Sequence, residues 1–219
     1  MVEISLIIEG GVLPGSADVV TMDNSQALRQ SLHRIFKDVL GFEVSIKIQL
    51  GAGYRAATRQ FAASSETNSC LYVDLDNKRE CIPDWFDKLV TENPGKPIRI
   101  PDDKRQNVFF MIQEMEAWIL KQPAAIERWG KDNHYIRTHS DEPIKGHSLI
   151  AGKNIEDIKK PSNALGEIIK HFFSKERDGK SKKIQYGKLK SAPGLLDCLN
   201  ATELKENDAE LQRFCATYS

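Results

Sequence analysis

The chain has 219 residues, of which 28% are charged, and its 31 basic and 31 acidic residues give a formal net charge of zero. This length supports a sizeable apolar core, and the zero net charge neither requires nor excludes a nucleic-acid partner. No segment approaches the ~18 apolar residues of a membrane span, and the start MVEISLIIEGG lacks the basic residues and cleavage site of a secretory signal. We therefore expect no membrane association and a cytoplasmic location.

Strand and helix patterns alternate through the first half of the chain. Continuous or alternating apolar residues predict strands over 3–9, 43–50, 69–74 and 107–112. Apolar residues at helical spacing predict helices over 24–40, 54–64, 83–92 and 114–121. Each predicted strand is thus followed by a predicted helix, which is the pattern of βα units.

From about residue 130 the pattern changes. Residues 130–160 are polar and irregular, which predicts an extended insertion or loop region. Helical patterns return over 162–176, 188–199 and 202–216, so an all-helical C-terminal extension is expected. We therefore expect two parts, an α/β core over 1–129 and, over 130–219, the irregular insertion and a helical extension that packs on the core.

The alternating elements predict an α/β fold with a mostly parallel four-stranded sheet flanked by helices. In such sheets the functional crevice lies beyond the carboxyl ends of the strands. Acidic residues follow three of the four predicted strands, namely Glu9, the pair Asp74 and Asp76, and the pair Glu114 and Glu116. Because parallel strands end at one edge of the sheet, these acids are expected to face a common crevice.

Asp74 and Asp76 lie one residue apart at the end of the apolar run CLYVDLD, and Glu9 ends the earlier run ISLIIE. Mg²⁺ prefers oxygen ligands and keeps several waters, so one to three carboxylates suffice for a catalytic site. We expect Asp74 and Asp76 to be ligands of Mg²⁺ or Mn²⁺, and Glu9 to be a third ligand or a general base. The alternative is that each Asp only caps a helix or makes an Asx turn.

Glu114 and Glu116 in QEMEAWIL are expected in the first turn of a helix. They are further candidate acids for the crevice. Negative charge at a helix N-terminus also interacts favourably with the helix dipole, and this alternative applies to both residues.

Basic residues offer candidate phosphate contacts. Arg55 follows GAGY at a predicted helix start, where free backbone amides can bind anions. Residues 170–190 hold eight basic and two acidic residues, and Tyr186 next to Lys188 and Lys190 suits a nucleic-acid backbone. Lys188 is our candidate for stabilising charge on a scissile phosphate, and Lys190 for phosphate binding. The alternative is a solvated helix end and loop.

Several segments together resemble the Toprim fold, the catalytic domain of topoisomerases and primases. IIEGG at a first strand end and VDLD at a third carry this likeness. The order of IIEGG, ALRQSL, GYRAATRQF, LYVDLD and MIQEMEAWIL, with the later YGKLKSAPGLLDCL, resembles more closely a Toprim-like bacterial family. Its members are often encoded beside ATPases of the OLD (overcoming-lysogenization-defect) or ABC type in loci linked to phage defence.

By this resemblance, Glu9 matches the Toprim glutamate that acts as general acid/base or metal ligand, and Asp74 and Asp76 match the metal-binding DxD pair. Glu116 matches the glutamate of the family's MEAW segment, for which Toprim chemistry gives no role. The stretch VLPGSADVVTMD at 12–23, with Gly15 in an expected turn, departs from the family pattern near Glu9.

The resemblance implies a magnesium-dependent nuclease, an effector that works on DNA or RNA with an ATPase partner. The alternative is a non-catalytic Toprim-like binding or regulatory subunit of that ATPase. Neither the oligomeric state nor the choice among DNA, RNA and a small phosphate ester follows from the sequence.

Overall fold

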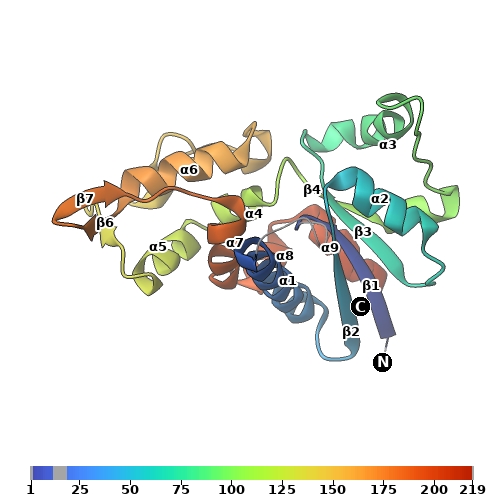
Figure 1. Ribbon diagram of the computed structural model, residues 1–219, viewed down its shortest axis with the longest axis horizontal. Coiled ribbons are helices and arrows are strands. Elements are labelled where there is room, and N and C mark those ends of the chain that lie inside the picture. The colour runs from blue at the N-terminus through green and yellow to red at the C-terminus, as the bar shows by residue number, and fades with distance from the viewer. Residues whose placement is uncertain (1, 12–18, 219) are drawn as a thin grey trace.

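The computed structural model describes residues 2–11 and 19–218. In this part of the chain, four strands form a fully parallel sheet in the order β2-β1-β3-β4 (Figure 1). Their bounds are Val2–Glu9 for β1, Val44–Gly51 for β2, Ser69–Asp74 for β3 and Val108–Met111 for β4. The predicted α/β fold with a four-stranded parallel sheet is therefore confirmed.

Helices cover both faces of this sheet. The helices connecting its strands are α1 (Val19–Leu40), α2 (Tyr54–Ala63) and α3 (Ile82–Thr91). Those that follow β4 are α4 (Glu116–Leu120), α5 (Pro123–Asp132), α6 (Pro161–Phe172), α7 (Lys188–Asp197), α8 (Ala201–Glu206) and α9 (Ala209–Tyr218). Single 3-10 turns lie at Arg79–Cys81, Asp102–Asn107, Ile144–Gly146 and Ile155–Asp157.

Strands β1, β3 and β4 are buried on both faces over most of their length, as parallel strands between helix layers require. The edge strand β2 instead alternates, with Ser45 and Lys47 exposed. Successive residues of β3 alternate between two apolar clusters: Leu71 and Val73 pack on the side of α2 and α3, whereas Cys70 and Tyr72 pack on the side of α1 and α9. Each face is thus sealed by its own helices, and the polar ends of the strands are left as the accessible part of the sheet.

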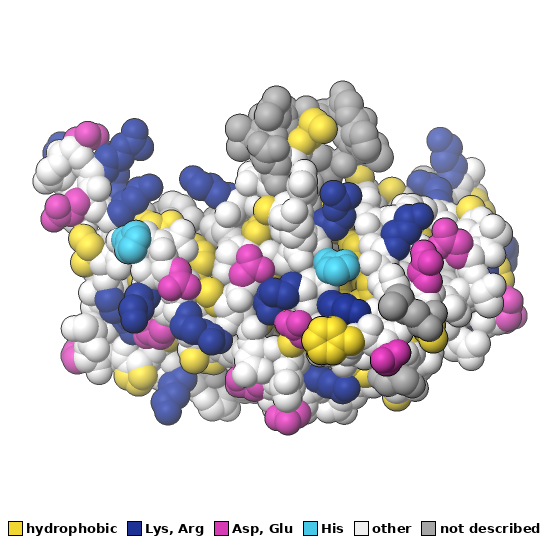
Figure 2. Space-filling view, turned by 90° about the horizontal axis from the view of Figure 1, so that it is seen from below, with side chains coloured by type: hydrophobic (Ala, Val, Ile, Leu, Met, Phe, Trp, Pro, Cys, Tyr) yellow, Lys and Arg dark blue, Asp and Glu magenta, His cyan; other side chains and the backbone are white. Residues whose placement is uncertain are grey.

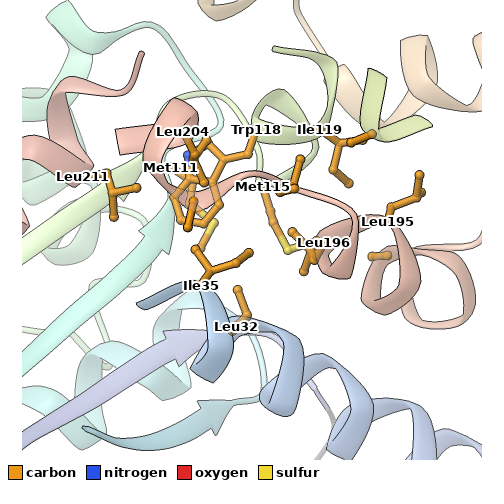
Figure 3. Packing of buried hydrophobic residues seen from close by; sticks show 14 of the residues in the cluster. Leu32, Ile35, Met111, Met115, Trp118, Ile119, Leu195, Leu196, Leu204 and Leu211 are labelled. Carbon is orange, nitrogen blue, oxygen red and sulfur yellow. The ribbon is translucent and has the colours of Figure 1, made fainter. Parts of the chain in front are cut away.

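The larger cluster continues without a break from the sheet into the C-terminal extension (Figure 3). Trp118 of α4 is buried next to Ile35 of α1 and Leu204 of α8, and Leu195 and Leu196 of α7 close the same cluster. Phe214 of α9 contacts the rings of three aromatic residues that line the sheet, Phe36, Tyr72 and Phe109. The extension is therefore packed into the same core as the sheet.

The C-terminal helical extension is confirmed, but it is not all-helical as expected. The described residues also form a three-stranded antiparallel sheet of β5 (Ile136–Arg137), β6 (Phe173–Arg177) and β7 (Lys180–Lys183), which Figure 1 shows at the end of the molecule far from α3. The predicted helix over 162–176 ends at Phe172 because Phe173 adopts an extended conformation (φ −132°, ψ 140°). The polar run beyond it forms a hairpin instead of a helix.

Two other predicted boundaries differ. The first helix starts at Val19 rather than at residue 24, so residues 19–23 of the departing stretch are helical, whereas residues 12–18, with the turn expected at Gly15, lie outside the described residues. The predicted helix over 202–216 is two helices, because the carboxylate of Asp208 accepts the backbone N–H of Leu211 and starts α9.

Gly130 sets the contact between α5 and the small sheet. A Cβ atom at this position would overlap the ring of Phe173, the first residue of β6. The absence of a side chain therefore lets the strand lie directly against the helix. None of the helices in the described part of the chain is long and apolar enough to span a membrane.

Candidate functional site

Glu9 and Asp74 meet at the carboxyl edge of the parallel sheet. Glu9 is the last residue of β1 and Asp74 the last residue of β3, and these two strands are neighbours. The backbone N–H of Asp74 donates to Oε2 of Glu9 over 3.2 Å. The sheet thus places two carboxyl groups side by side, as expected for acids that end adjacent parallel strands.

The Asp74 carboxylate is held from both sides. Its Oδ1 accepts the backbone N–H of Met115 over 2.9 Å, and its Oδ2 accepts Nζ of Lys188 over 3.1 Å. The Asp74 side chain is 11% exposed, so it is largely shielded from solvent. Lys188 is the first residue of α7, and the C-terminal extension thus supplies the cation that faces the sheet's acids.

Glu116 lies on the other side of the same lysine. It begins α4, as expected, and is fully buried. The Tyr186 hydroxyl donates to its Oε1 over 2.7 Å, and Nζ of Lys188 lies 3.5 Å from its Oε2, which has no hydrogen-bond partner among the described residues. Lys188 therefore bridges two carboxylates that are both shielded from water, Asp74 and Glu116.

A second lysine joins the two remaining acids. Nζ of Lys160 lies 3.3 Å from Oδ1 of Asp76 and 3.4 Å from Oε1 of Glu114. The backbone N–H of Ser162 donates to the other Glu114 oxygen over 2.9 Å. Glu114 precedes α4 by two residues, so its expected place in the first helical turn is wrong; it instead caps the start of α6. The resulting rim is more exposed than the site around Lys188.

The backbone of this rim is unusual. Asp76, Gln113 and Lys160 have positive φ values of 55°, 63° and 57°, although none of them is glycine. The loops after β3 and β4 hold one another, because the N–H of Asp76 donates to the Gln113 carbonyl and that of Gln113 to the Asn77 carbonyl. Left-handed conformations at non-glycine residues are strained, and such strain is often concentrated at functional sites. Three further residues of this kind, His134, His139 and Asp178, lie outside the rim.

The buried acids are hard to ionise. Burial raises the pKa of Glu9 from 4.5 to about 7, and the neighbouring charge of Asp74 adds to this effect. Burial likewise raises the pKa of Asp74 to about 6, with repulsion from Glu116, although Lys188 opposes the rise. Glu9 can therefore accept or release a proton near neutral pH.

The two lysines are held in their charged forms. Burial lowers the pKa of Lys188, but attraction to Asp74 and Glu116 outweighs it, so the pKa is raised overall. The charges of Asp76 and then Glu114 raise the pKa of Lys160. Burial opposes ionisation of Glu114, but its hydrogen bonds from Ser162 and the nearby ammonium of Lys160 hold its pKa below the usual value.

Arg55 and Lys190 do not join the acids. Arg55 is in the first turn of α2, as expected, but its guanidinium donates to Glu92 over 3.2 Å and to the Lys96 carbonyl over 2.8 Å. Lys190 is exposed on α7, two residues beyond Lys188, and lies in a different surface groove. Of the predicted cationic candidates, the structure brings Lys188 alone to the acids.

Two residues of the site were not predicted in their roles. Lys160 lies in a polar stretch where no spacing or motif connects it to acids 46 and 84 positions away. Tyr186, expected with Lys188 and Lys190 at a nucleic-acid backbone, instead directs its hydroxyl at buried Glu116. A tyrosine just ahead of GKLK gave no signal of an internal hydrogen bond.

The donor chemistry of the site fits a small divalent cation. Among the described residues, no group of three or more His, Cys, Asp or Glu side chains is arranged to hold a metal ion. Mg²⁺ needs fewer protein ligands, since one or two carboxylates with several waters are usual. Glu9 and Asp74 supply two adjacent carboxylates whose mutual repulsion a cation would relieve.

Comparison of the chain with protein-family models, with curated proteins and with solved structures finds no match. The resemblance to the Toprim fold therefore stays a prediction.

Proposed function

We propose that this protein is a magnesium-dependent phosphodiester hydrolase, a nuclease of the Toprim type. The observation that carries the proposal is the half-buried Glu9–Asp74 pair facing Lys188 at the carboxyl edge of a parallel sheet. The edge of the sheet where such folds bind their ligands thus holds the groups that this chemistry requires. They are carboxylates for a hard cation, a proton acceptor, and an ammonium group for a phosphate.

The residues have separate roles in this proposal. Glu9, with a pKa of about 7, takes a proton from the attacking water and returns it to the leaving oxygen. Asp74, with Glu9 and Asp76, would hold the Mg²⁺ or Mn²⁺ ion. Lys188 stabilises charge that develops on the phosphate. When bound, the metal supplies a water of lowered pKa and neutralises the phosphate.

The partner is proposed from the resemblance to the Toprim-like family. An OLD or ABC-type ATPase would control the nuclease, and the pair would act in defence against phage. DNA and RNA are both candidate substrates, because a phosphodiester is common to them.

A second function has one observation in its favour. Each acid of the crevice other than Glu9 is already paired with a lysine, either Lys188 or Lys160. Such pairing suits a non-catalytic subunit in which the acids hold the sheet and the extension together. In that case the protein binds or regulates the ATPase and cleaves nothing.

Cleavage assays separate the two functions. Purified protein is incubated with labelled DNA and RNA in Mg²⁺, in Mn²⁺ and in EDTA, with and without the ATPase, and metal binding is measured by calorimetry. The nuclease proposal predicts metal-dependent cleavage that Asp74→Asn reduces at least a hundredfold, a loss typical of a removed metal ligand or charge stabiliser. The matched control Asp87→Asn, an exposed acid of α3, retains full activity.

The opposite outcomes are equally clear. Equal cleavage by Asp74→Asn and the natural protein would show that the assigned site is wrong. A protein that binds no metal and cleaves nothing with the ATPase present would establish the non-catalytic function.

A further inference from the structure

The hairpin of β6 and β7 carries one strongly cationic face. Its two-residue turn is Asp178–Gly179, with φ values of 55° and 68°, as a tight hairpin turn requires. The register pairs Lys175 with Lys182 and Arg177 with Lys180. Side chains two residues apart along a strand share a face, so these four cations lie together. Directly opposed like charges destabilise a sheet, and this fold tolerates two such pairs.

This cationic surface borders a groove with a volume of about 290 Å³. Five basic side chains line the groove: Lys175, Arg177, Lys182, Lys183 and Lys190. None of the described residues that line it is acidic. Figure 2 shows Lys and Arg side chains gathered over the end of the molecule where Figure 1 places the hairpin.

Three of these cations lack the carboxylate partners that the crevice lysines have. In the described residues, no carboxylate lies within 4.0 Å of the ammonium groups of Lys175, Lys182 and Lys190, whereas the guanidinium of Arg177 is 3.7 Å from Asp178. All four side chains are on exposed residues. Uncompensated cations around a groove bind a polyanion at little cost, because no internal ion pair has to break.

Aromatic rings form the other part of the groove. Trp129 of α5 is almost fully buried and Tyr135 is half-buried, with ring centroids 5.2 Å apart at an interplanar angle of 67°. Both line the groove next to the cations. An aromatic ring beside backbone-binding cations is typical of proteins that hold unpaired bases, since every base can stack on such a ring.

The groove adjoins the acid crevice through the chain itself. Ile184, Gln185 and Lys190 line the groove, while Tyr186 and Lys188 between them contact the crevice acids. The first turn of α7 thus contributes one residue to each site, Lys188 to the crevice and Lys190 to the groove.

We propose that this groove binds single-stranded nucleic acid, with phosphates on Lys175, Lys182 and Lys190 and a base against Tyr135. Delivery of the strand to the crevice for cleavage rests on the proposed nuclease function, whereas binding in the groove does not.

Fluorescence anisotropy tests the binding. The probe is labelled oligo-dT of about 16 nucleotides, the upper range that one such site covers, in EDTA so that cleavage plays no part. Lys175→Ala with Lys182→Ala is expected to weaken binding roughly five- to tenfold and to reduce the slope of log K against log salt by about 1.4. The matched double variant Lys47→Ala with Lys96→Ala, which removes two exposed lysines elsewhere, leaves both quantities unchanged.

A second variant guards against misfolding of the hairpin. Gln185→Glu places one carboxylate in the groove on an exposed residue and is expected to weaken binding by at least about threefold. Binding by the groove variants that equals that of the natural protein would overturn the site. Equal affinity for a duplex of the same length would overturn the preference for single strands. Comparison with a labelled RNA of the same length shows whether the affinity depends on the sugar.

Asp74→Asn separates this inference from the proposed nuclease function. If the groove is correct, this variant binds the probe as the natural protein does. Retained binding with no cleavage by the natural protein would refute the nuclease and leave the groove standing. Cleavage that persists undiminished in the groove variants would refute delivery of the strand by the hairpin.

Discussion

The two sides of the acid crevice come from different parts of the chain and are placed by different forces. The acids Glu9 and Asp74 end neighbouring strands, so the hydrogen-bonded register of the sheet aligns them. The cations Lys160 and Lys188 come from the C-terminal extension, and side-chain packing with a few side-chain hydrogen bonds aligns them. The position of the acids therefore does not depend on any one side-chain contact, whereas the position of the cations depends on how the extension packs.

The largest effect is expected where the extension packs on the sheet. Phe214→Ala removes a fully buried ring that contacts Phe36, Tyr72 and Phe109, and should lower the free energy of unfolding by about 4 kcal/mol. Urea denaturation measures this loss. The control is Phe42→Ala, because Phe42 is 90% exposed and its removal should change stability by less than about 0.5 kcal/mol. A similar loss in both variants would contradict the proposed dependence on packing.

The next effect concerns Lys188. Lys188→Met leaves the buried carboxylate of Glu116 without its cation and should destabilise the fold by about 2–3 kcal/mol at pH 8. Adding Glu116→Gln removes that stranded charge, so the double variant should recover part of the loss, as measured by the same denaturation. If the double variant is less stable than the single one, Glu116 is not held by Lys188.

A pH-dependent effect is expected for Glu9. Its pKa in the folded protein is about 7 against 4.5 ordinarily, so the folded state retains a proton that the unfolded state releases, and stability falls as pH rises between these values. Glu9→Gln lacks this ionisation while its amide oxygen still accepts the N–H of Asp74. It should stabilise the protein by about 2 kcal/mol at pH 8 and change little at pH 4. A stability difference between the two proteins that does not change with pH would show that the pKa of Glu9 is not raised.

The smallest effect is expected for Lys160. Its side chain is 60% exposed, and exposed ion pairs contribute less than about 1 kcal/mol. Lys160→Met should therefore leave thermal unfolding almost unchanged, in contrast to Lys188→Met. A loss as large as that of Lys188→Met would remove the distinction between the lysine that faces buried Glu116 and the lysine of the exposed rim.

Local patterns predicted the sheet and the position of its acids. Alternating strands and helices indicate parallel strands, and the carboxyl ends of neighbouring parallel strands lie at one edge of the sheet. The positions of Glu9 and Asp74 could be predicted from their own strands, without information on residues far along the chain. The position of Lys160 could not be predicted in this way, because its partners Asp76 and Glu114 lie far along the chain and no motif connects them. Side-chain packing across the extension is not encoded in a short window, and for this reason the cations were harder to place than the acids.

The small antiparallel sheet was missed for a different reason. The apolar spacing of 162–172 continues the helical pattern up to Phe172, and the polar run after it carries no apolar alternation. The Asp178–Gly179 pair was the available signal, because this dipeptide is typical of two-residue hairpin turns. This dipeptide predicts a cationic hairpin in the basic stretch, in place of a helix end.

The missing side chain at Gly130 has a consequence for how this chain can vary. Even a methyl group there would collide with the ring that begins β6, and the ring is itself enclosed by the core. A substitution at 130 would therefore have to be matched by a smaller residue at 173, and the hairpin would shift with it. The orientation of the cationic face thus depends on the residues at both positions.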